Sequence, residues 1–111
     1  MTLTTVTASD FEEQVLKSTS PVIVLFSTRG KKSSDNMVNS LEEAVKAHGA
    51  QISFLEKAFD QEGSIEKKKT YDVQSAPTTL FFKGGKLERT VVGFYKFEGV
   101  FKTWVEELSQ A

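Results

Sequence analysis

The hydrophobic pattern of the chain alternates between the period of a β-strand and that of an α-helix. Two short, continuous apolar runs, residues 22–26 and 79–82, are typical of strands that are buried on both faces of a sheet. Apolar residues recur at helical spacing over residues 37–45 and again over residues 97–108. These four segments predict a chain in which strands and helices follow one another.

Weaker patterns fill the gaps between these segments. A strand is predicted around Val6 and another over residues 52–55. Short helices are predicted over residues 11–16 and over residues 65–71, the second of them strongly basic. No stretch of the sequence has the composition of a linker or the period of a repeat. The chain therefore reads as one continuous domain.

The last two strands are expected to form a hairpin. Lys83-Gly84-Gly85-Lys86 separates the run 79–82 from residues 87–92, and glycine readily takes the positive φ that such turns require. Strands separated by helices pair in parallel, whereas the hairpin adds antiparallel strands to the same sheet. The prediction is a single α/β domain over residues 1–111 in the order β-α-β-α-β-α-β-β-α, with a five-stranded mixed sheet flanked by four helices.

The composition excludes several classes of function. The 111 residues include no cysteine and one histidine, His48, which excludes disulfides, thiolate nucleophiles and Cys-rich or His-rich metal sites. A formal net charge of −1 and the lack of a reading motif argue against nucleic acid as a partner. The longest apolar runs are too short to span a membrane. We expect no catalytic residue, cofactor or metal, and a cytoplasmic location.

Three segments carry a family resemblance. The chain contains Val22-Ile23-Val24-Leu25-Phe26-Ser27, then Ala76-Pro77-Thr78-Thr79-Leu80-Phe81-Phe82-Lys83-Gly84-Gly85, and then Val92-Gly93-Phe94. In this order and spacing the segments resemble the thioredoxin family over essentially the whole chain. The resemblance implies the thioredoxin fold, an active-site loop after the first segment and a cis peptide bond between Ala76 and Pro77. It also implies that the turn at Gly93 forms the third wall of a substrate groove.

The chain departs from the family pattern at the positions of the family's catalytic residues. Members carry Trp-Cys-Gly-Pro-Cys in the active-site loop, and an ungapped count places Lys31-Lys32-Ser33-Ser34 over the Cys-Gly-Pro-Cys quartet. One inserted residue would shift the quartet to Lys32-Ser33-Ser34-Asp35, and both registers stay open. The buried aspartate of the family falls on Leu25. Because thiol–disulfide exchange requires a thiolate, we expect a redox-inactive protein.

The altered loop and the groove favour a binding role instead. Basic residues precede a helix N-terminus, which attracts an anion or an acidic peptide segment. An extended segment can also pair with the backbone of the groove without any cysteine, and we expect Tyr95 to be exposed there and Phe94 to pack inward. The resulting hypothesis is a protein-binding or scaffolding subunit of a larger assembly, such as a cytoskeletal or microtubule-associated one. It would dock through the former groove and loop: Arg29, Lys31, Lys32, Ser33, Ser34, Ala76, Pro77, Gly93 and Tyr95.

Two alternatives stay open. The lysines of the loop, like those at residues 67–69, can be solvated surface residues without a ligand. The other alternative is a small glutathione-binding or transferase-like enzyme. In that case Ser33 or Ser34, the expected N-cap of the helix, would stabilise a bound thiolate, as a hydroxyl does in glutathione-binding enzymes on related folds.

Overall fold

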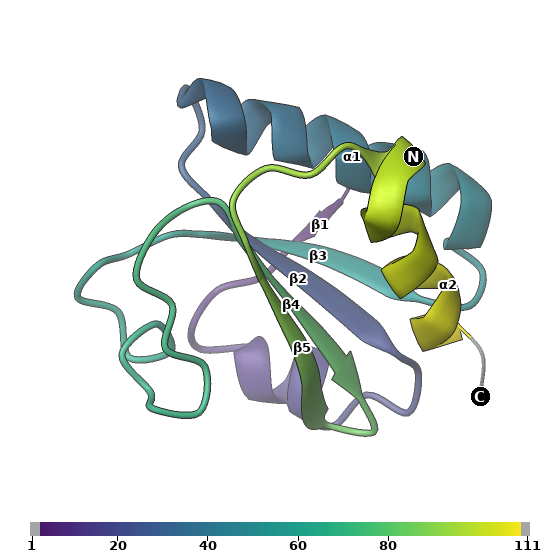
Figure 1. Cartoon of the computed structure of the whole chain (residues 1–111). Coiled ribbons are helices and arrows are strands. Elements are labelled where there is room, and N and C mark those ends of the chain that lie inside the picture. Colours follow the sequence, from purple (N-terminus) through teal and green to yellow (C-terminus); the bar gives the residue numbers. More distant parts are fainter. Residues whose placement is uncertain (1–2, 110–111) are drawn as a thin grey trace.

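A computed structural model describes residues 3–109 and contains one five-stranded sheet, in the order β1-β3-β2-β4-β5 (Figure 1). β1 pairs in parallel with β3, and β3 in parallel with β2, whereas β4 is antiparallel to both β2 and β5. The predicted mixed sheet is confirmed. Its strands are β1 (Thr4–Thr5), β2 (Val22–Ser27), β3 (Ser53–Ala58), β4 (Thr78–Lys83) and β5 (Lys86–Val92).

Helices cover the two faces of the sheet unequally (Figure 1). α1 (Lys32–His48) and α2 (Lys102–Ser109) lie on one face, and α2 is preceded by the irregular turn η2 (Phe97–Phe101). The opposite face carries η1 (Glu12–Leu16), a single π-type turn where a short helix was predicted. All six residues of β2 are buried, because this strand is central and covered on both faces.

Alternation along β2 divides the core into two clusters. Ile23 and Leu25 face α1 and α2, whereas Val22, Val24 and Phe26 face η1. The cluster beside η1 is rich in aromatic rings that meet at tilted or edge-on angles, with centroids 5.6–6.3 Å apart. The rings in these contacts are Phe11, Phe26, Tyr71 and Phe82.

The predicted basic helix over residues 65–71 is wrong. Residues 59–77, here called the connector, join β3 to β4 through turns without a regular helix or strand (Figure 1, teal to green at the left). Glu66 explains the difference, because its carboxylate accepts a hydrogen bond from the Asp60 N–H and its carbonyl accepts one from the Val73 N–H. These contacts fold the segment back on itself. Of the four predicted helices, the first corresponds to η1, the second to α1 and the fourth to η2 with α2. The connector stands in place of the third.

The remaining features agree with the pattern of the sequence. Gly84 and Gly85 both have positive φ in the β4–β5 hairpin, as the turn prediction requires. Within residues 3–109, neither of the longer helices combines the length and the apolar character that a membrane crossing demands.

Candidate functional site

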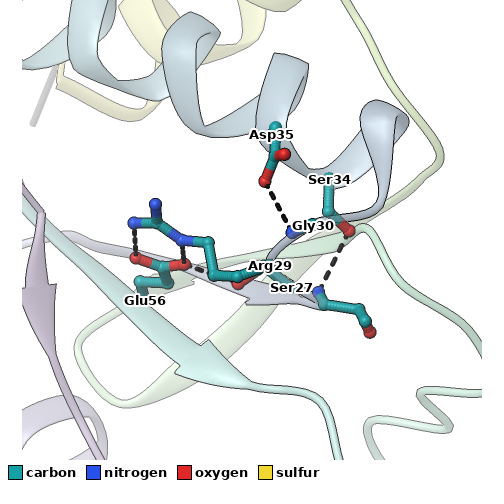
Figure 2. A network of polar contacts seen from close by, with 7 residues as sticks. Ser27, Arg29, Gly30, Ser34, Asp35 and Glu56 are labelled. Carbon is teal, nitrogen blue, oxygen red and sulfur yellow. Dashed lines mark hydrogen bonds and ion pairs between the residues drawn. The ribbon is translucent and has the colours of Figure 1, made fainter.

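The loop that replaces the thiol motif is held by its own side chains. β2 ends at Ser27 and α1 begins at Lys32, so residues 28–31 form the loop (Figure 2). The Ser34 hydroxyl accepts a hydrogen bond from the Thr28 N–H at 3.1 Å, and the Asp35 carboxylate accepts one from the Gly30 N–H at 3.2 Å. Two side chains from the first turn of α1 therefore bind the preceding loop. Gly30 has a φ of 95°, which favours glycine.

The N-cap prediction for α1 is wrong. The N-cap is Lys31, and it makes no side-chain capping hydrogen bond. Ser34 is fully buried and its hydroxyl oxygen points back to the loop, whereas Ser33 is half-buried. Ser34 is therefore engaged inside the protein and does not present its hydroxyl to a ligand.

Arg29 is bound to a buried carboxylate on the neighbouring strand. Its Nε and Nη2 atoms donate to the two oxygens of Glu56 at 2.6 and 2.7 Å, and the Ser27 hydroxyl donates to Glu56 at 2.6 Å (Figure 2). The hydrogen bond from Arg29 holds the pKa of the Glu56 carboxyl below its ordinary value, against the burial that would raise it. The hydrogen bond from Ser27 lowers that pKa further. Arg29 thus serves an internal ion pair, although its side chain is 65% exposed.

Lys31 reaches across to the loop that precedes β4. Its Nζ donates to the Ala76 carbonyl oxygen at 2.7 Å, and Ala76 is itself buried. The Ala76–Pro77 bond is cis, which confirms the prediction made from the resemblance. The Gly93 N–H donates to the Pro77 carbonyl at 2.8 Å, so the three walls of the expected groove do meet. However, one backbone acceptor of the groove is already occupied by the protein's own lysine.

The aromatic residues beside Gly93 are placed opposite to expectation. Phe94 is 39% exposed, whereas Tyr95 is half-buried and packs edge-on against Trp104 with ring centroids 5.3 Å apart. The Tyr95 carbonyl accepts a hydrogen bond from Ser40 on α1. The predictions for these two side chains are therefore wrong. Lys32, by contrast, is exposed.

The network includes three side chains outside the predicted site, those of Ser27, Asp35 and Glu56. Glu56 lies in β3 directly opposite Leu25, so its side chain comes next to the end of β2. A signal was present, since Glu56 and Lys57 interrupt an otherwise apolar strand and charges inside a sheet need partners. The identity of those partners depends on the register between β2 and β3, which the sequence does not specify.

The position of the family's buried aspartate contains no titratable group. Leu25 is fully buried and lies opposite Thr79 of β4, whose hydroxyl is buried without a hydrogen-bond partner. Over residues 3–109, no cluster of three or more His, Cys, Asp or Glu side chains is arranged to hold a metal ion. Leu25 therefore supplies no proton acceptor, and the Glu56 carboxylate opposite it in β3 is engaged by Arg29 and Ser27.

Two clefts on the described surface are lined almost entirely by residues outside the predicted site. A cleft of about 540 Å³ lies between η1, the end of α1 and β3, and none of the predicted site residues lines it. A second cleft, of about 410 Å³, flanks the Arg29–Glu56 pair at the carboxyl ends of β1, β2 and β3. Of the nine predicted residues, only Arg29 borders this second cleft.

Comparison with known proteins agrees with the fold. The family model described as thioredoxin matches residues 2–107. The chain is 37% identical over 91 residues to a thioredoxin of Streptomyces clavuligerus, covering 82% of each protein. It is 33% identical over 91 residues to a thioredoxin of Rickettsia bellii (strain RML369-C), covering 82% of this chain and 85% of that protein. A thioredoxin of Acidithiobacillus ferridurans is 32% identical over 88 residues, or 79% of this chain and 80% of the relative.

These relatives correct the expected function. All three are thioredoxins, and nothing in their names indicates a scaffolding subunit or a cytoskeletal assembly, so that hypothesis is wrong. Of the two serines in the glutathione alternative, Ser34 is buried and engaged with the Thr28 N–H, which leaves only Ser33 for that role. With the fold, the cis bond and the matched length in agreement, this cysteine-free chain belongs to the thioredoxin family.

Proposed function

We propose that this chain is a non-enzymatic member of the thioredoxin family, which acts by non-covalent recognition and not by electron transfer. One observation carries the proposal: the segment at the position of the family's thiol motif contains no thiol, and three of its residues make hydrogen bonds inside the protein. Arg29 is paired with Glu56, Lys31 with Ala76 and Ser34 with Thr28. Side chains that are held by partners inside the protein stabilise the local structure, whereas a catalytic loop keeps reactive groups open to substrate.

Turnover assays test the non-enzymatic part of the proposal. The purified chain is assayed for insulin disulfide reduction and for conjugation of glutathione to a model electrophile. We expect rates equal to those of buffer in both assays. A double variant, Lys31→Cys with Ser34→Cys, is the positive control for reduction, since a thiolate at a helix N-terminus is reactive. Turnover by the natural chain that Ser33→Ala abolishes would overturn the proposal.

We further propose that the partners are proteins and that they contact exposed apolar residues beside Gly93. Val92 is 62% exposed and Phe94 is 39% exposed, and they flank the glycine that bonds to Pro77. Exposed aromatic and aliphatic side chains are common anchors of protein interfaces. This surface shares Gly93 with the docking surface first expected, but its contacts would come from the side chains of Val92 and Phe94.

Paired surface variants test the partner proposal. Phe94→Ser is compared with Val100→Ser, which removes an apolar side chain that is 48% exposed in η2. We expect proteins captured from native extract by the natural chain to be lost with Phe94→Ser and retained with Val100→Ser, in the presence or absence of reductant. Equal capture by both variants would show that the surface at Val92 and Phe94 does not bind these proteins. A cytoplasmic location stays a prediction, which cell fractionation tests.

A further inference from the structure

The backbone of the connector is hydrogen-bonded to the rest of the protein at its two ends. At the first end, the Phe59 N–H donates to the Ser27 carbonyl at 2.8 Å. At the other end, the Pro77 carbonyl accepts the bond from Gly93 and the Ala76 carbonyl accepts the bond from Lys31. Between these anchors, the backbone hydrogen bonds of residues 60–74 join the segment to itself.

One buried ion pair fastens the middle of the connector to the sheet. Lys57 of β3 donates to Glu66 at 2.5 Å, and the two side chains are only 7% and 1% exposed. The Lys57 ammonium also lies 5.5 Å from the centre of the Phe26 ring. The second carboxylate oxygen of Glu66 is buried without a partner. Glu66 therefore supplies the polar attachment of a segment that otherwise contributes Ile65, Tyr71 and Val73 to the core.

We propose that residues 60–74 open and close as one unit about the two anchored ends, with the Lys57–Glu66 ion pair as the fastener. Because the backbone hydrogen bonds of the segment stay within it, opening separates side chains from the core and breaks no strand pairing, so we expect it to need a lower free energy than opening of the sheet. Opening uncovers the aromatic face of the sheet, including Phe26 and Phe82, while the strands stay paired. This inference does not rest on the proposed function.

Native-state hydrogen exchange of the unmodified chain, at increasing sub-denaturing urea, tests the inference first. The amides of Lys67, Tyr71, Asp72 and Val73 all donate within the segment and report its opening. We expect these four to exchange together, and at a lower free energy of opening than the amides of β2 and β4. Exchange of all of them only through global unfolding would overturn the inference.

A matched pair of variants then tests the fastener. Glu66→Gln removes one charge of the buried pair, and Glu62→Gln makes the same change in the exposed Lys67–Glu62 pair, which is 2.7 Å long with side chains 60% and 78% exposed. We expect Glu66→Gln to accelerate exchange of the segment by roughly 100-fold or more relative to the strands, and Glu62→Gln to leave it unchanged. Equal effects of the two variants, or uniform acceleration across the sheet, would show that the pair is not a fastener. If Glu66→Gln does not fold, the urea dependence of the natural chain decides alone.

Discussion

At the scale of single residues, two adjacent threonines at the start of β4 have opposite surroundings. The Thr78 hydroxyl donates to the Ser75 carbonyl at 2.7 Å, whereas the equally buried Thr79 hydroxyl has no partner and lies opposite Leu25. A buried polar group without a partner contributes nothing to offset its desolvation. We therefore predict that Thr79→Val leaves the free energy of unfolding unchanged or raises it. Thr78→Val should lower it by about 1–3 kcal/mol. Urea denaturation of both variants measures the difference, and a larger loss for Thr79→Val would contradict the assignment.

Glu56 makes the free energy of unfolding depend on pH in the acid range. Because the hydrogen bond from Arg29 lowers its pKa in the folded state, the ionised carboxylate stabilises the fold above its unfolded pKa. That contribution is lost as the pH falls below about 4.5 and through the folded pKa. We predict that the difference in unfolding free energy between the natural chain and Glu56→Gln is largest at neutral pH and shrinks below pH 4.5. Urea denaturation across this pH range checks the prediction. A difference that grows as the pH falls would contradict a lowered pKa for Glu56 in the folded state.

At the scale of elements, the junction of the loop and α1 depends on Ser34. Ser34→Ala leaves the Thr28 N–H without its acceptor in a partly buried position. We expect a loss of about 1–2 kcal/mol in unfolding free energy. Ser33→Ala is the matched control, because Ser33 is half-buried in the same turn and alanine favours helix. It should change stability by less than about 0.5 kcal/mol. Equal losses for the two serines would show that the contact between Ser34 and Thr28 does not decide the effect.

The elements differ in how far their own sequences determine them. β2, β4 and the hairpin were predictable, because continuous apolar runs and paired glycines act over a few residues. The connector was not, since residues 65–71 have a helical apolar spacing but are held in turns by Glu66. Lys57, which binds Glu66, lies nine positions away in β3. Contacts of this kind become visible only when the strands are placed side by side.

At the scale of the whole molecule, the chain keeps the architecture of its family while the reactive positions have changed. The sheet order, the cis bond before β4 and the turn at Gly93 are all present. Among the predicted site residues before and at the start of α1, Arg29, Lys31 and Ser34 make contacts through their side chains. The sequence could indicate that these residues surround a former active site. It could not indicate that they bind Glu56, Thr28 and Ala76, because those pairings depend on the assembled sheet.

If residues 28–31 now form a structural element, Lys31 should contribute to the free energy of unfolding and the adjacent Lys32 should not. Lys31→Met removes the bond to the Ala76 carbonyl, whereas Lys32→Met changes its exposed neighbour, the first residue of α1. Urea denaturation at neutral pH gives the free energy of unfolding of each variant. The account predicts a loss of about 1 kcal/mol for Lys31→Met and no change beyond about 0.5 kcal/mol for Lys32→Met. Unchanged or increased stability for Lys31→Met would contradict the account, since that is the behaviour of a residue kept for function at the expense of stability.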